Sequence, residues 1–404
     1  MKAPGTLPRA RSTLRPDTAE PGRSGLTTAS TVAVVTVLTS LPVFLPGAAN
    51  GLICAEYGWS SARMGAVLAV YWLASLAGAY VTKHAAVPRV VERVLAVALG
   101  VTALGLACAA AAPMAGLWVS SALGGFVYGS TQPHTNALLM RRCPPRTRAF
   151  AFGLKQAAVP AATLLASASM PLLAQPAGWR PLFGLTAVLC AATTVPLLRR
   201  HERTGPGPGG PRRQHAPLRL DRYLTTLSCA GFLGAMVGNG LGGFLLLSLT
   251  SRGTSLAVAS AVATAGAALN IAVRLCTGWL ISRRPGAIRP ALTALFLTGA
   301  CGTALITGTH LALAATGALL AYGGGWGWAG LLHYVIGLPY PGQEQRATAY
   351  SQMGVSLGAA AGPLLCGALF TTAPHALWWA LTTAGAGAAG CVLVARRGGV
   401  GGGT

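Results

Sequence analysis

The chain of 404 residues contains very few acidic residues. Seven Asp and Glu stand against 30 Lys and Arg, which gives a formal net charge of +23, and charged residues make up only 9% of the sequence. Soluble domains carry about 25% charged residues, so this chain has too few to cover a water-exposed surface. The composition argues against a soluble enzyme or a cytosolic binding module, and its apolar content of 53% excludes a disordered chain.

Paired cysteines and catalytic motifs are also missing. The nine cysteines occur singly, with no Cys-x-x-Cys pair, and therefore support neither a disulfide framework nor a zinc site. No ATP-binding loop, serine nucleophile elbow or His-Glu-x-x-His helix occurs, and no two aspartates lie close enough in the sequence to hold Mg²⁺. We therefore expect neither an enzyme nor a cofactor. A receptor or scaffold would need a larger extramembrane domain than the loops provide.

Long apolar stretches fill most of the sequence. A helix of about 20 residues crosses a hydrocarbon core of about 30 Å, and helices are required because lipid offers no partner for backbone polar groups. We predict an all-α polytopic membrane protein with 12 transmembrane helices. The predicted spans lie near residues 27–49, 62–82, 94–112, 116–139, 149–173, 178–198, 223–248, 256–281, 290–309, 311–338, 347–371 and 375–395.

The positions of the cations give an independent test of this topology. Of the 30 Lys and Arg, 25 lie in the alternate set of segments that contains both termini, and three lie in the opposite set. Cytoplasmic loops are enriched in Lys and Arg, so we expect both termini in the cytoplasm and a multi-pass protein of the cell membrane. This distribution accounts for the positive charge without a nucleic-acid partner.

The spans divide into two sets of six. A basic Gly-Pro-rich segment separates them, and Gln156-Ala-Ala-Val159 in the first set has a counterpart in Gln352-Met-Gly-Val355 of the second. Equal span counts and such matches favour two pseudo-symmetric halves. The predicted parts are a disordered cytoplasmic tail (1–26), a six-helix bundle (27–198), a cytoplasmic linker (199–222), a second six-helix bundle (223–395) and a cytoplasmic tail (396–404).

One loop motif occurs after the second span of each half. The clearer copy is Arg274-Leu-Cys-Thr-Gly278-Trp-Leu-Ile-Ser282-Arg283-Arg284-Pro-Gly286, and the weaker copy runs from Gly78 through Lys83 to Arg89. With these motifs and its span pattern, the chain resembles the major facilitator superfamily over residues 27–397. Ser282 replaces the aspartate that is usual in the family, which weakens the expectation of a charge-pair latch.

Other stretches are similar to a bacterial branch of that family that includes cyanate- and carboxylate-type permeases. They are Glu56-Tyr-Gly-Trp-Ser60, Phe152-Gly-Leu-Lys155-Gln156-Ala-Ala-Val-Pro160, Gly178-Trp-Arg180-Pro-Leu-Phe183 and Gly323-Gly-Gly-Trp326-Gly-Trp328. The Gly-Pro-x-x-Gly-Gly signature of drug antiporters is absent from the fifth span.

The resemblance implies transport by alternating access, in which two halves rock about a midplane site. It also implies that the fifth and eighth spans adjoin, and that the second, fifth, eighth and eleventh spans form sliding seams. The candidate gating residues are Gly78, Lys83, Arg89, Gly278, Arg283, Pro160, Gly362 and Pro363.

Two charged side chains fall inside predicted spans. Lys155 lies about 10 Å and Arg274 about 13 Å from the nearest basic loop residue on its own helix, at 1.5 Å per residue. One explanation is snorkelling to the interface. However, no predicted span contains an Asp or Glu that could neutralise these cations. We therefore expect an anionic substrate to bind between Lys155 and Arg274.

Uncharged polar residues at similar depth complete the candidate substrate site. The alternative for each is an ordinary interhelical hydrogen bond worth about 0.6 kcal/mol. Buried histidines at His134 and His333 could titrate or be structural. The candidate set besides the two cations is Gln156, Asn270, Gln132, His134, Gln352 and Asn239.

The sequence therefore predicts a transporter for a small molecule, and the buried cations favour a small organic anion. The alternative is efflux of an amphipathic drug or secondary metabolite. Uniport, exchange and symport of an anion with a proton all remain open. We expect a lipid-embedded monomer whose partner is its small-molecule substrate.

Overall fold

The computed structural model describes residues 21–84, 91–203, 218, 220–370 and 372–395, and it places no β-strand among them. The first half of the chain forms α1 (Pro21–Ala48), α2 (Asn50–Tyr57), α3 (Ser61–His84), α4 (Val91–Ala111), α5 (Pro113–Arg142), α6 (Pro145–Ser169), η1 (Met170–Ala174), α7 (Gln175–Ala177) and α8 (Trp179–Arg203). The second half forms α9 (Arg222–Thr250), α10 (Leu256–Arg283), η2 (Pro285–Ala287), α11 (Ile288–Ile306), α12 (Leu311–Leu320), η3 (Ala321–Gly325), α13 (Ala329–Gly337), α14 (Glu344–Leu369) and α15 (Pro374–Val394).

The helix ends follow local chemistry. The side chain of Asp221 accepts a hydrogen bond of 2.8 Å from the backbone N–H of Leu224 and caps the start of α9. Proline occupies the first turn of α5, α6 and α15, where its missing N–H costs no hydrogen bond. Gly58 ends α2 at a φ of 62°, a left-handed conformation that glycine adopts without steric cost.

Ten helices of the described chain are long and apolar enough to cross a membrane. The other two predicted spans differ from them in structure. The span at 116–139 is a continuous helix, α5, which carries the polar side chains of Gln132, His134 and Asn136. The span at 311–338 is broken into α12, η3 and α13 by a glycine run. The predicted all-α, 12-helix membrane fold is confirmed, with this break as its main irregularity.

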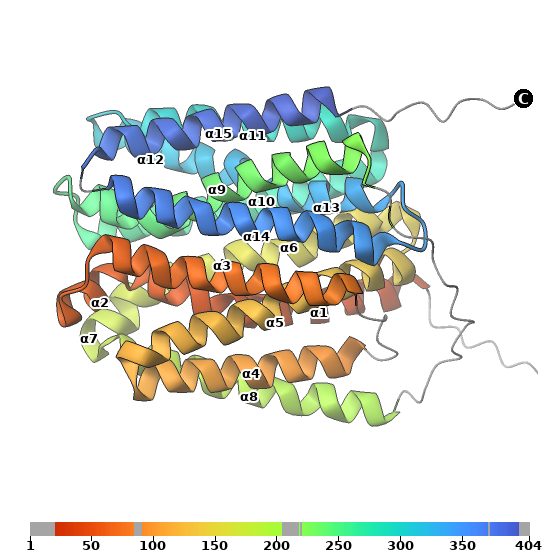
Figure 1. Ribbon diagram of the computed structural model, residues 1–404, viewed down its shortest axis with the longest axis horizontal. Coiled ribbons are helices and arrows are strands. Elements are labelled where there is room, and N and C mark those ends of the chain that lie inside the picture. Colours follow the sequence, from red (N-terminus) through yellow and green to blue (C-terminus); the bar gives the residue numbers. More distant parts are fainter. Residues whose placement is uncertain (1–20, 85–90, 204–217, 219, 371, 396–404) are drawn as a thin grey trace, which may run out of the picture.

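The two sets of helices pack in corresponding ways. Within the first set α1 contacts α6, α4 contacts α8 and α3 contacts α5. Their counterparts repeat the pattern, because α9 contacts α14, α11 contacts α15 and α10 contacts α12 and η3. Figure 1 shows α4 and α8 along one edge and α11 and α15 along the opposite edge, with α3 and α14 side by side between them. The halves are therefore pseudo-symmetric.

The halves meet through the predicted seam helices. α3 packs against α14, and α6 packs against α10, so the fifth and eighth spans adjoin as the family resemblance implied. A Cβ added at Gly153 of α6 would lie 2.6 Å from the carbonyl oxygen of Arg274, and one at Gly278 of α10 would lie 3.0 Å from the carbonyl oxygen of Ala149. Glycine at these two positions allows the halves to approach closely.

Two glycines of the seam helices that were predicted as gating residues, Gly78 and Gly362, do not contact the partner half. A Cβ at Gly78 would lie 2.2 Å from the carbonyl oxygen of Phe126 on α5, and one at Gly362 would lie 2.4 Å from that of Met236 on α9. Both contacts are within a bundle, because helix periodicity points these residues away from the partner half. Gly78 and Gly362 therefore support bundle packing, and the contact between the halves uses Gly153 and Gly278.

The structure also bears on the predicted boundaries. α1 begins at Pro21, inside the predicted N-terminal tail, and α8 extends to Arg203, inside the predicted linker. The predicted tail residues 1–20, the linker residues 204–217 and 219, and the C-terminal tail 396–404 lie outside the described residues, as does Arg89.

Candidate substrate site

Arg274 of α10 lies at the contact between the two halves and is only 2% exposed. Its Nη1 donates to the backbone carbonyl of Gln156 on α6, and its Nη2 donates to the backbone carbonyl of Trp326. Its Nε has no hydrogen-bond partner. The guanidinium is therefore held by one carbonyl from each half, and part of its donor capacity is unused.

Both carbonyls are available because neither has a hydrogen-bond partner within a helix. Pro160 has no N–H, so the carbonyl of Gln156, four residues earlier in α6, has no partner within the helix. Trp326 follows η3, in the turn that precedes α13, outside regular helix. Irregular backbone is tolerated at membrane depth where it is buried in protein or lines a cavity, and here it binds a buried cation.

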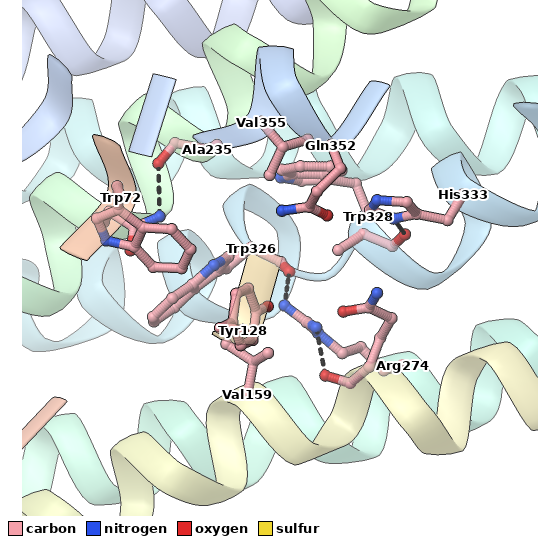
Figure 2. Close-up of a pocket in the computed structure, with 13 residues that line it drawn as sticks. Trp72, Tyr128, Val159, Ala235, Arg274, Trp326, Trp328, His333, Gln352 and Val355 are labelled. Carbon is pink, nitrogen blue, oxygen red and sulfur yellow. Dashed lines mark hydrogen bonds between the residues drawn. The ribbon is translucent and has the colours of Figure 1, made fainter. Parts of the chain in front are cut away.

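A small cavity lies beside Arg274. Its residues come from both halves, which is the position expected of a midplane substrate site. Figure 2 shows the guanidinium of Arg274 close to Tyr128, with Gln352 and His333 on another side of the cavity. The lining residues are Trp72, Tyr128, Gln156, Val159, Ala235, Asn239, Arg274, Trp326, Trp328, Ala329, His333, Gln352 and Val355.

Aromatic rings form much of the wall. Trp72 and Tyr128 pack edge to face, with ring centroids 5.6 Å apart, and Trp326 packs against Phe44 at 5.6 Å. Among the described residues that line the cavity, Arg274 is the one with a permanent charge, and none is an Asp or Glu. The cavity thus combines flat apolar surfaces with one uncompensated cation.

Lys155 is placed differently from the prediction. It is completely buried, and its Nζ donates to the side-chain oxygen of Asn136 and, at 3.3 Å, to the backbone carbonyl of Gln132, both on α5. It does not line the cavity. Successive helical residues point about 100° apart, so Gln156 faces the cavity and α10 while Lys155 faces α5. The predicted pair of cations around one substrate is therefore replaced by Arg274 alone.

The other candidate residues divide into two groups. Gln156, Gln352 and Asn239 line the cavity. Gln352 donates to Ser356 at 3.3 Å, and Asn239 donates to the carbonyl of Ala235 at 2.9 Å.

The candidates outside the cavity have neighbours of their own. The side-chain amide of Asn270 donates to the carbonyl of Tyr322, and Gln132 accepts from Lys155 through its backbone. His134 contacts Gln345 of α14, with 3.3 Å between Nδ1 and Oε1. Asn270, Gln132 and His134 therefore form hydrogen bonds within the protein around the site and do not line the cavity.

The remaining gating candidates have varied surroundings. Pro363 lines a smaller apolar cavity that shares Trp72 and Asn239 with the first. The guanidinium carbon of Arg283 lies 4.1 Å from the ring centroid of Trp279. Lys83 belongs to the last turn of α3, and its side chain lies outside the part of the chain that the structure describes.

The sequence interpretation missed the aromatic part of the site. Trp72 and Tyr128 lie in apolar spans, where an aromatic residue is usually packing material. The available signal was the run Gly323-Gly-Gly-Trp326-Gly-Trp328, because so many glycines inside one apolar span indicate a broken helix.

Comparison with known proteins gives a family match. A family model described as "Major Facilitator Superfamily" matches residues 32–336. No curated protein matches the chain. Among solved structures, the human organic anion transporter MFSD10 (TETRAN) has a TM-score of 0.69 and 18% sequence identity, over 92% of this chain and 99% of that one. At this identity the likeness concerns the fold.

Proposed function

The chain belongs to the major facilitator superfamily, and we propose that it carries a small organic anion across the cell membrane by alternating access. The observation that carries the proposal is Arg274, a buried cation that lines the cavity between the halves without a carboxylate partner. An ionised side chain at membrane depth is costly, and a bound anion would provide its missing countercharge.

The chemistry of Arg274 suits a carboxylate. Guanidinium binds carboxylates through charge-assisted hydrogen bonds that are stronger than neutral ones, and Nε has no partner in the structure. The rings of Trp72, Tyr128 and Trp326 suit a flat apolar group beside that carboxylate. An aromatic carboxylate is therefore the substrate class that fits the cavity best. The resemblance of several sequence stretches to carboxylate-type permeases, an expectation from the sequence alone, favours the same class.

The aromatic wall also favours a second candidate, efflux of an amphipathic compound. Aromatic faces attract cations, which are common among amphipathic drugs. Arg274 would repel a cation at the same place. The charge of the ligand therefore separates the two functions.

A matched ligand series tests the proposal. Benzoate, benzyl alcohol and benzylamine share one ring and are negative, neutral and positive near pH 7. We expect benzoate to raise the melting temperature of the purified protein most. Arg274→Gln should weaken benzoate binding by roughly tenfold or more, from the loss of a charged hydrogen bond of about 1.5–3 kcal/mol. Arg274→Lys keeps the positive charge but lacks the paired N–H donors of the guanidinium, and it should bind benzoate with an intermediate affinity.

Preference for benzylamine, retained in Arg274→Gln, would instead support efflux of amphipathic cations. Equal binding of all three compounds would contradict an anion site.

We further propose that both termini lie in the cytoplasm. The support is the excess of Lys and Arg in alternate loops. A reporter enzyme that is active only in the cytoplasm should be active when it is fused to either end of the chain. Activity at one end but not at the other would place the two termini on opposite sides of the membrane and contradict this topology.

A further inference from the structure

His333 of α13 is the second group at the cavity whose hydrogen-bonding capacity is unused. It is 2% exposed and lines the same cavity as Arg274. Its Nδ1 lies 2.8 Å from the backbone carbonyl oxygen of Ala329, while its Nε2 has no hydrogen-bond partner. Figure 2 shows the imidazole near Gln352 and Trp328, at the wall of the cavity.

The Ala329 contact fixes the tautomer of His333. A carbonyl oxygen only accepts hydrogen bonds, so the proton lies on Nδ1. In the neutral ring, Nε2 then carries a lone pair. This atom is the one without a partner, and it is free to accept a proton without disturbing the bond to Ala329. The ring is therefore held in the orientation in which a proton can be added or removed at the cavity.

The charges near His333 make its protonation depend on whether an anion is bound. The charged or titratable groups near His333 belong to three helices, and the cavity residues from α9 and α14 are neutral. Like charges in a low-dielectric site repel each other, so a proton on His333 is opposed by the two cations when the cavity holds no anion. Arg274 on α10 and Tyr128 on α5 line the same cavity as His333, and Lys155 on α6 lies behind the cavity wall, where its charge also acts on His333.

We propose that His333 binds the proton that travels with the anion. Nε2 takes the proton from the solution on the side where the anion enters, and the resulting imidazolium and Arg274 together face the bound anion. When the site opens to the other side, the anion leaves and Nε2 returns the proton to that solution. One anion and one proton move together, and no bond other than N–H is formed or broken. This inference rests on the anion transport proposed above.

The coupling has an energetic consequence. Each elementary charge that crosses a membrane potential of 100 mV costs or gains about 2.3 kcal/mol. A monovalent anion that moves alone into a cell with a negative interior must pay this energy, whereas an anion and a proton together carry no net charge. The predicted spans contain no Asp or Glu to bind such a proton. Among the buried side chains of the described chain, the histidines are His134 and His333.

Proton uptake on binding can be measured directly. Titration calorimetry with benzoate at pH 7.5, in Tris and in imidazole buffer, gives the number of protons taken up, because the two buffers differ in ionisation enthalpy. Benzoate is already ionised at this pH, so any proton taken up goes to the protein. We expect uptake of up to one proton per benzoate, and an affinity that falls by at most about tenfold for each unit of rising pH.

Two histidine variants assign the proton to a residue. His333→Gln should still bind benzoate, but without proton uptake and with an affinity independent of pH. His134→Gln is the matched control, because His134 is buried outside the cavity, and it should take up protons as the unchanged protein does.

The results that would contradict this inference can be told apart from those that would refute the anion site. Benzoate binding by the unchanged protein without proton uptake between pH 6 and 8.5 would overturn the inference and leave anion transport intact. Uptake in His333→Gln equal to that of the unchanged protein would also overturn it. If His333→Gln does not fold, loss of uptake in His134→Gln would count against His333. Failure of benzoate to bind at all would refute the proposed anion site and this inference together.

Discussion

Individual buried cations in this protein are satisfied by neutral oxygens. Arg274 donates to two backbone carbonyls, and Lys155 donates to an amide oxygen and a carbonyl. A charge that is hydrogen-bonded but lacks a countercharge remains costly at membrane depth. The two residues differ in one respect that decides their roles: Arg274 lines the cavity between the halves, whereas Lys155 is enclosed by protein.

The first prediction separates these roles. Lys155→Gln should change benzoate affinity by no more than about threefold, because the side chain does not reach the cavity and its hydrogen bonds go to α5, so it donates none to an anion there. The same substitution at Arg274 should lower affinity by about tenfold or more. Calorimetry on both variants checks this. A loss in Lys155→Gln as large as that in Arg274→Gln would restore the two-cation site predicted from the sequence.

Residue chemistry could be predicted from the sequence, but side-chain direction could not. The absence of acidic residues from the spans marked Arg274 and Lys155 as unusual, and the position of Gln156 beside Lys155 drew it into the candidate site. One step along a helix rotates the side chain by about 100°. Which of two adjacent residues faces the partner half therefore depends on how α6 is rotated against α10, and only packing determines that.

At the scale of elements, the site depends on helices that are interrupted. Pro160 removes one hydrogen bond from α6. In the tenth span, the π-helical segment η3 and the turn after it separate α12 from α13. Each interruption frees one carbonyl for Arg274. Apolar length and charge placement predicted the spans well. The break at η3 was not predicted, because a glycine-rich apolar stretch meets the same length criterion whether or not its helix is continuous.

The second prediction tests this role of proline. In Pro160→Ala, the new N–H would bond the carbonyl of Gln156 and compete with Arg274. We expect benzoate affinity to fall by about fivefold, equivalent to about one hydrogen bond of 1 kcal/mol. Pro196 provides the control, since it lies exposed within α8, away from the cavity. Pro196→Ala should leave the affinity unchanged, and calorimetry that shows equal effects of the two substitutions would refute the assignment.

At the scale of the whole molecule, the two halves are held together near one end by neutral hydrogen bonds. Gln345, in the first turn of α14, donates through Nε2 to the carbonyl of Thr82 on α3 at 3.1 Å and accepts through Oε1 from Nδ1 of His134 on α5 at 3.3 Å. Deeper in the protein, the hydroxyls of Ser75 and Ser356 lie 2.9 Å apart. A neutral amide therefore joins α14 to the first half here, and at the other contact of the halves the hydroxyl of Ser282 on α10 accepts from the backbone N–H of Phe150 on α6 at 3.2 Å.

The hydrogen bonds of Gln345 between the two halves lead to the third prediction. Gln345→Ala removes both hydrogen bonds and leaves the buried carbonyl of Thr82 without that donor, so separation of α14 from α3 should become easier by about 1–2 kcal/mol. In nanodiscs, backbone amides near Thr82 and in the first turns of α14 should exchange hydrogen about five- to thirtyfold faster.

Gln175→Ala, at an exposed site in α7, supplies the control and should exchange as the unchanged protein does. Since alternating access requires this end to open and close, faster exchange should be accompanied by altered benzoate uptake into proteoliposomes. Exchange that is unchanged in Gln345→Ala would mean that the contact of α3 with α14 along their length closes this end, and that the glutamine contributes little.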